Sequence, residues 1–240
     1  MKLGKITAAS TAFFFVFFLG LTLKAAEDTH TQTYVILING EKSGTETVTE
    51  EKDRSGNVIL SSKHELLVKD GAARNRMVFS TRMVLSKGAR NIRTYACRYQ
   101  TGQSGDSYEV SIQNGRITRV LTRNGQPGVV SAPFTSNMVI VDFNVYHHYE
   151  YLLRRYDRRK KGIQTFANYI PVIGNDIPVK VAWIGDENLI FGEKTIETSR
   201  FIVELADITT VMISVDKNNR LVVLENPAQE LKVIREDLLP

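Results

Sequence analysis

The stretch that decides the fold runs from Tyr108 to Gly125, YEVSIQNGRITRVLTRNG. Apolar Tyr108, Val110 and Ile112 alternate with polar side chains, which is the period-two pattern of a half-buried β-strand. An Asn-Gly pair divides the stretch at 114–115 and a second pair ends it. Asn-Gly favours the positive φ angles of a two-residue hairpin turn, so the stretch predicts antiparallel strands joined by tight turns.

The same pattern runs through most of the chain. Upstream, it predicts strands at 34–38, 45–51, 58–69, 77–85 and 92–100. Downstream, it predicts strands at 163–170, 177–184, 189–195, 198–205, 209–216 and 221–225, with a final segment, 230–236, that pairs back. The predicted fold class is mainly β, an antiparallel curved sheet or open barrel, with a first meander of about seven strands.

The period changes once, between residues 143 and 160. A helical stripe of apolar residues is formed there by Val145, Tyr149, Leu152 and Tyr156. Asp142 or Asn144 is available as the N-cap and Gly162 as the stop. One covering α-helix is therefore expected near 143–160, as a plug or cover for the sheet. Residues 125–142, which contain Pro127 and Pro133, are expected to be irregular.

The N-terminal segment has the three parts of a secretory signal peptide. Lys2 and Lys5 precede an apolar run from Ile6 to Leu23, and small residues follow. Cleavage after Ala25 is expected, which leaves a single β-rich domain at 26–240 in the periplasm or outside the cell. The alternative is an uncleaved membrane anchor, because about 18 apolar residues is close to the minimum that spans a bilayer.

The charge of the chain is uneven along its length. The formal net charge is +5, and removal of Lys2, Lys5 and Lys24 with the leader lowers it to about +2. Residues 74–123 hold ten basic and two acidic side chains, whereas 27–70 and 176–240 are net acidic. The basic stretch is either a cationic sheet face or is neutralised by acidic neighbouring strands. Nucleic acid is not an expected partner, because no recognition motif accompanies the charge.

Two segments carry a family resemblance. The opening YVILINGEKSGT, residues 34–45, and the ending ISVDKNNRLV, residues 213–222, flank a near-continuous series of strands. Together they resemble uncharacterised exported bacterial families whose curved sheet is similar to that of the LolA and LolB lipoprotein carriers. The resemblance implies an incomplete barrel that wraps over a helix and leaves an apolar concavity. It assigns a role to no individual residue.

The leading functional hypothesis is a noncatalytic periplasmic or envelope protein that binds an amphiphile or lipidated partner in this concavity. Face parity gives a candidate lining of Tyr34, Ile36, Phe79, Met83, Tyr95, Tyr149, Leu152, Tyr156 and Trp183. The alternative is a structural or protein-interaction module that uses edge strands for β-augmentation. A hydrolase would require a cluster of histidines and carboxylates at the base of a pocket.

The end of the predicted helix is strongly basic. Its six cations are Arg154, Arg155, Arg158, Arg159, Lys160 and Lys161. Such a segment can lie against an anionic membrane surface, where each cation contributes about 1 kcal/mol. Cations in a last turn also complement the helix dipole, at about 0.3–1 kcal/mol each, and otherwise remain in water.

No pattern of metal ligands or catalytic residues is present in the sequence, so neither a metal, a cofactor nor an enzymatic activity is expected. His147 and His148 are adjacent and diverge by about 100° on a helix, which suits packing or solvent exposure better than chelation. His64 and Glu65 fall on opposite faces of one strand. Cys97 is expected to be buried filler, and as the only cysteine it forms no internal disulfide.

Overall fold

The computed structural model describes residues 29–70, 73–88, 91–102, 104–135, 138–206 and 208–239. The predicted signal peptide and its cleavage point lie outside the described residues. Within them, no helix is long and apolar enough to cross a membrane.

Strands make up most of the described chain. They are β1 (His30–Ile38), β2 (Glu41–Lys52), β3 (Val58–Asp70), β4 (Ala73–Leu85), β5 (Ile92–Thr101), β6 (Ser104–Gln113), β7 (Arg116–Arg123), β8 (Gln126–Pro133), β9 (Ile163–Phe166), β10 (Tyr169–Ile170), β11 (Asn175–Asp176), β12 (Val179–Phe191), β13 (Lys194–Leu205), β14 (Thr209–Val215), β15 (Leu221–Asn226) and β16 (Leu231–Arg235). The one α-helix described is α1 (His147–Arg154), and two 3₁₀ turns cover Pro227–Gln229 and Glu236–Leu238.

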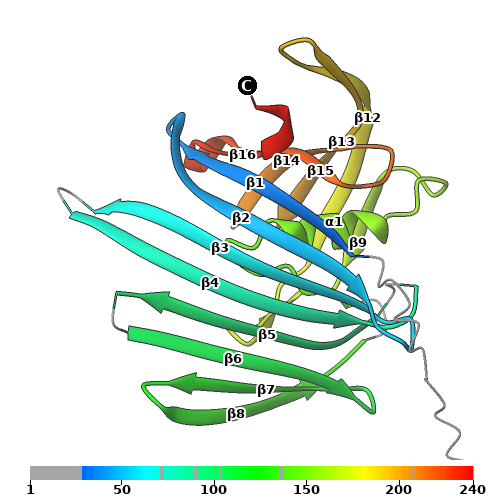
Figure 1. Ribbon diagram of the computed structural model, residues 1–240. Coiled ribbons are helices and arrows are strands. Elements are labelled where there is room, and N and C mark those ends of the chain that lie inside the picture. The colour runs from blue at the N-terminus through cyan, green and yellow to red at the C-terminus, as the bar shows by residue number, and fades with distance from the viewer. Residues whose placement is uncertain are drawn as a thin grey trace, which may run out of the picture.

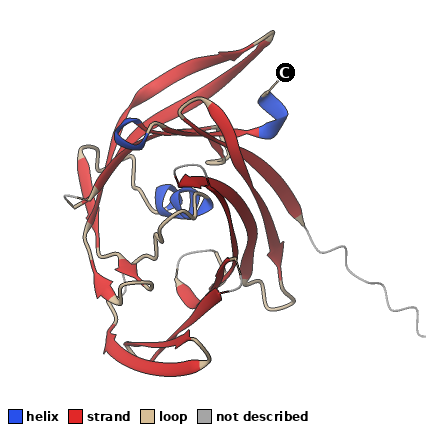
Figure 2. Cartoon of the chain, turned by 90° about the vertical axis from the view of Figure 1, so that its left-hand side faces the viewer, coloured by secondary structure: helices blue, strands red, loops and turns tan. Residues whose placement is uncertain are grey.

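Fourteen of these strands form one antiparallel sheet in the order β8-β7-β6-β5-β4-β3-β2-β1-β16-β15-β14-β13-β12-β9. The first and last described strands meet in the middle of this sheet, where β1 pairs with β16 from Tyr34–Arg235 to Ile38–Leu231. The sheet curls around α1 as an open barrel (Figures 1 and 2). The predicted fold class, a mainly β curved antiparallel sheet with a single helix, is confirmed.

The hairpin turns follow from the Asn-Gly pairs. Asn114 and Gly115 adopt φ angles of 50° and 71°, and Asn124 and Gly125 adopt 50° and 76°. These positive φ angles match the right-handed twist of the flanking strands, which is why the turns hold register without longer loops.

The predicted strand 230–236 also pairs back, as β16.

The first meander has eight strands instead of seven, because part of the stretch predicted as irregular forms β8. Pro127 and Pro133 stand near the two ends of this strand. Proline lacks an N–H for a ladder hydrogen bond, and β8 is an edge strand with a partner only in β7. The two prolines are unfavourable in a central strand, which is why the stretch was predicted to be irregular, but they are tolerated in an edge strand.

The helix is shorter than the predicted 143–160. It begins at His147 with Tyr146 at the N-cap position, so neither Asp142 nor Asn144 caps it, and Asn144 is left-handed with a φ of 57°. At the other end, the helix ends at Arg154, with Arg155 as its C-cap. Seven of the eight helical residues are buried, since the helix lies inside the curve of the sheet (Figure 2). It is therefore a plug and does not cover an outer face.

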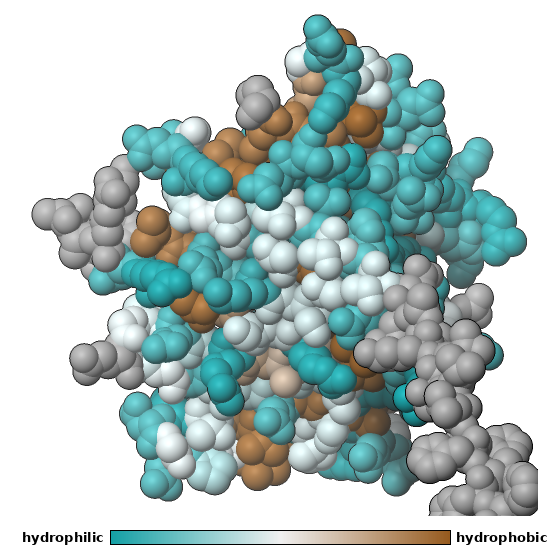
Figure 3. Space-filling model, in the orientation of Figure 1, coloured by the Kyte–Doolittle hydropathy of each residue, from teal (hydrophilic) through white to brown (hydrophobic). Residues whose placement is uncertain are grey.

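At β15 and β16, both sides of the sheet carry buried apolar side chains. All four residues from Leu221 to Leu224 are buried. Leu221 and Leu224 belong to the main core inside the sheet. Val222 and Val223 belong to a small second cluster with Ile234 and Leu238. Figure 3 shows the outside of the first meander as mainly polar, with apolar side chains gathered at the top beside the C-terminal turn.

The chain between the two meanders crosses the interior. Val139 forms a parallel bridge with Asn168. Arg119 of β7 is buried and donates from Nη1 to the Pro171 carbonyl at 2.7 Å. The Arg119 hydrogen bond ties the loop after β10 to the first meander.

Candidate binding pocket

Most of the concavity is filled by protein. Residues Met138 to Val141 are fully buried, as is most of α1. The interior therefore resembles a packed core over much of its length.

A mainly apolar hollow of about 290 Å³ lies beside this packed part, and we take it as the candidate binding pocket. It lies between strands β4–β7 and the segment that leads into α1. Its apolar lining is Met77, Phe79, Tyr99, Tyr108, Leu121, Phe143 and Val172, and its polar lining is Asp106, Arg123, Asp142 and Asn144. Arg123 and Asp106 form an ion pair at 3.1 Å.

Asp142 is a buried carboxyl group in the wall of this pocket. Its Oδ2 accepts hydrogen bonds from the hydroxyls of Tyr95 at 2.9 Å and Tyr108 at 2.5 Å. Its Oδ1 accepts from the backbone N–H of Phe143 at 3.0 Å. Burial raises the pKa of Asp142 to about 6, against the opposing effect of the tyrosine hydroxyls. The group therefore titrates just below neutral pH while both oxygens stay hydrogen-bonded.

Three histidines lie behind this wall, and their partners fix their tautomers. His64 donates from Nδ1 to the Asn144 carbonyl at 2.7 Å, whereas Nδ1 of His148 accepts from the Asp142 N–H at 3.2 Å. Burial lowers the pKa of both rings, so both are neutral. The Nε2 atoms of His64, His147 and His148 are buried without a hydrogen-bond partner.

Glu46 of β2 holds the start of the helix. It is fully buried, and its Oε2 accepts from the N–H groups of Tyr146 at 3.2 Å and His147 at 3.3 Å. Its Oε1 lies 2.8 Å from Nδ1 of His147. A carboxylate from a distant strand thus supplies the acceptors that a local N-cap residue normally provides.

A second polar network anchors the far side of α1. Glu150 accepts from the Tyr34 hydroxyl and from the Leu221 N–H, the latter at 3.1 Å. Arg220 reaches Glu50 at 2.6 Å, and Arg154 reaches the same carboxylate at 3.0 Å. These contacts connect α1 to β1, to β2 and to the start of β15. The charged groups of this network bind one another and so anchor the helix.

The structure separates the predicted lining residues into three groups. Phe79 lines the candidate pocket, and Tyr149 borders a smaller hollow described below. Trp183 is only partly buried, beside the core. The other six are packed in the main core cluster: Tyr34, Ile36, Met83, Tyr95, Leu152 and Tyr156. Face parity found inward-facing residues, but it could not distinguish those beside a hollow from those that fill the interior.

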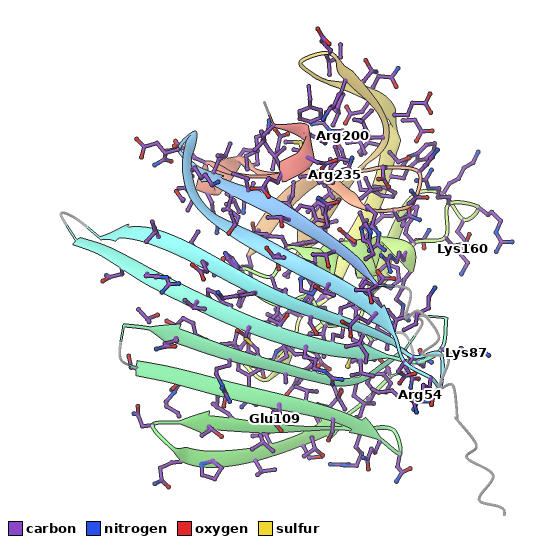
Figure 4. The ribbon with its side chains drawn as sticks, viewed as in Figure 1. Arg54, Lys87, Glu109, Lys160, Arg200 and Arg235 are labelled. Atoms are coloured by element: carbon purple, nitrogen blue, oxygen red, sulfur yellow. The ribbon has the colours of Figure 1, made fainter. Side chains whose placement is uncertain are left out.

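The predicted cationic segment is not one uniform surface. Arg154 is paired with Glu50, and Arg155 donates from Nη1 to the Met138 carbonyl at 3.0 Å. Arg158 lies over the ring of Trp183, 5.9 Å from its centroid. Arg158, Arg159, Lys160 and Lys161 are all exposed, and Figure 4 shows Lys160 pointing away from the protein. Contact with an anionic surface stays a prediction.

The remaining candidate residues are placed as follows. His147 and His148 are both buried, so their role is packing and not solvent exposure. Cys97 is buried as predicted, and burial raises the pKa of its thiol to about 11. Among the residues that the structure describes, no group of three histidine, cysteine or acidic side chains could hold a metal ion.

A larger depression of about 670 Å³ lies elsewhere, along β12 and β13, and its lining is polar. Several of its side chains are already paired. Ser199 donates to Asp186 at 2.5 Å, and Glu187 accepts from Ser214 at 2.7 Å and Arg200 at 3.1 Å. This depression lacks the apolar walls of a typical small-molecule site.

Comparison with known proteins supports the fold. The chain is similar to the crystal structure of a β-barrel-like protein of a domain of unknown function, DUF1849, from Brucella abortus, with a TM-score of 0.61 and 8% identity. The match covers 86% of this chain and 94% of that chain. No protein-family model matches the sequence, and no curated protein matches it. The predicted resemblance to uncharacterised barrel-like proteins is thus supported at the level of fold, and the narrower likeness to LolA and LolB is not confirmed.

Proposed function

We propose that this chain is a noncatalytic binding protein of the bacterial envelope, which holds the apolar part of a small amphiphile in the candidate pocket. The observation that supports it most is the pocket itself, a mainly apolar hollow between β4–β7 and Phe143 in a largely packed interior. The secretory leader predicted from the sequence supports the compartment.

The volume of the pocket favours a ligand with one short chain or ring. Small-molecule pockets range over about 300–1,000 Å³, and this one, at about 290 Å³, is at the lower limit. Several acyl chains, as on a lipoprotein, exceed it. Of the ligand classes predicted from the sequence, a single-chain lipid therefore fits better than a lipidated protein.

The charged groups of the pocket suggest how the ligand is oriented. Arg123 is exposed, and its guanidinium is available to an anionic headgroup in exchange for part of its ion pair with Asp106. Both oxygens of Asp142 already accept hydrogen bonds inside the protein, from the two tyrosine hydroxyls and the Phe143 N–H. The tail accordingly lies against the rings of Phe79, Tyr108 and Phe143, with the headgroup towards Arg123.

Binding of an apolar fluorescent naphthylamine dye, with displacement by single-chain fatty acids, tests the proposal. Val172 lines the pocket and is 42% exposed, so Val172→Trp obstructs it without disturbing the core. Ile173→Trp is the matched control, since Ile173 is 46% exposed and lies next to it outside the lining. We expect stoichiometric dye uptake that Val172→Trp weakens at least tenfold and Ile173→Trp leaves unchanged. Absence of uptake by the folded wild-type protein would contradict the proposal.

The alternative, a protein-interaction module, is favoured by one observation. β8 is an edge strand, and its Val129 and Val130 are 67% and 44% exposed. An extended peptide could add to this edge by main-chain hydrogen bonds. Site-specific photo-crosslinking from Val129 in cells, with the similarly exposed Ile190 as a control position, distinguishes the two functions. One defined protein adduct from Val129 alone, together with no dye uptake, would favour the interaction module.

A further inference from the structure

A second, smaller hollow lies behind the candidate pocket. It measures about 70 Å³ and sits between the start of α1 and strands β14 and β15. Its walls are mainly apolar: Tyr146, Tyr149, Leu205, Ile208, Val211, Leu224 and Leu231, with Thr209, Asn226 and Gln229 as polar members. Asn226 is buried, and its Oδ1 has no hydrogen-bond partner.

The two hollows share one wall, the segment from Asp142 to Asn144. Both ends of this wall are held in place. The Asp142 carboxylate is bound by Tyr95 and Tyr108, and the Asn144 carbonyl by His64. Phe143, between them, is only partly buried. Its side chain lines both hollows, and it is the apolar member of the wall.

We infer that Phe143 determines ligand specificity, by setting the longest straight acyl chain that the pocket accepts. The inference rests on the proposed function. A chain that enters from the Arg123 side ends at the Phe143 ring. Removal of that ring joins the pocket to the hollow beyond it, whose Val211 and Leu224 supply further apolar contacts.

Competition for the naphthylamine dye by a homologous series of straight-chain fatty acids measures this limit. For the wild type, affinity rises with chain length and then reaches a plateau. For Phe143→Ala, the plateau should move to longer chains, with affinity rising about fourfold for each further methylene buried. Phe134→Ala is the matched control, because Phe134 packs against the same core and lines neither hollow.

Two further variants keep the test decisive if Phe143→Ala folds poorly. Phe143→Leu shortens the side chain more gently and should shift the plateau in the same direction. Ile208→Trp fills the second hollow from its exposed side, so it should cancel the shift when combined with either Phe143 variant and leave short-chain binding unchanged.

The outcomes separate the two proposals. If the wild type binds no fatty acid of any length, the proposed function is wrong. If the wild type binds and the folded Phe143 variants show the same plateau, the function stands and the assignment of Phe143 is wrong. A shift that persists in the presence of Ile208→Trp would also overturn it, because the extra chain would then lie elsewhere.

Discussion

Replacement of Glu46 by alanine should cost a large part of the stability of the fold. The carboxylate is 0% exposed and accepts from two backbone N–H groups, of Tyr146 and His147, while its other oxygen meets the His147 ring. Alanine leaves these groups buried without acceptors, at about 1–3 kcal/mol each, and the effects overlap because they share one residue. We expect a loss of about 3–5 kcal/mol, as for other broken buried pairs.

Equilibrium unfolding in urea, followed by the fluorescence of Trp183, measures this loss. Glu109→Ala is the control of the same residue type, since Glu109 is exposed on the outer side of β6 (Figure 4). It should change the free energy of unfolding by less than about 0.5 kcal/mol. Glu46→Gln keeps one acceptor oxygen and should fall between the two. A loss below about 1 kcal/mol for Glu46→Ala would refute the claim that this carboxylate caps α1.

Three further predictions concern other parts of the fold. The folded-state pKa of Asp142, about 6, lies above the ordinary value of 3.8. The protonated group therefore stabilises the fold fully below about pH 4, and this stabilisation is lost as the pH rises through 6. Between these pH values the free energy of unfolding of the wild type should fall by about 3 kcal/mol relative to that of Asp142→Asn. Cys97 should react with a thiol reagent only after unfolding, and fast reaction of the native protein would contradict its burial. A Cβ at Gly44 would lie 2.1 Å from the Glu65 carbonyl oxygen, whereas one at Gly128 has its nearest contact at 3.9 Å; Gly44→Ala should therefore lower the thermal midpoint strongly and Gly128→Ala only slightly.

The fold could be predicted because its rules are local. Alternation in Tyr108–Gln113 and the Asn-Gly turns at 114 and 124 specify hairpins without knowledge of the rest of the chain. The sequence failed to predict the features that depend on residues far away along the chain, namely the start of α1 and the strand β8. The start of α1 depends on Glu46, about a hundred positions away in sequence, and strand β8 is permitted by its place at the edge of the sheet.

The candidate site could be predicted only in part. Inward-facing Phe79 was found by parity, but its neighbour across the pocket, Asp142, was considered only as a possible N-cap. Its burial between Tyr95 and Tyr108 depends on how the interior segment threads the sheet. The volume left beside Phe143 is likewise a property of the packed interior, which no pattern in the sequence records.

The central claim is that the pocket beside Phe143 carries a small amphiphile, and native mass spectrometry of the protein gently purified from the periplasm tests it most directly. The account predicts a chain that begins at Ala26 and carries one small apolar adduct, released on denaturation and absent from Val172→Trp. A cleaved, folded protein whose native and denatured masses agree, and which takes up no added single-chain lipid, would contradict it.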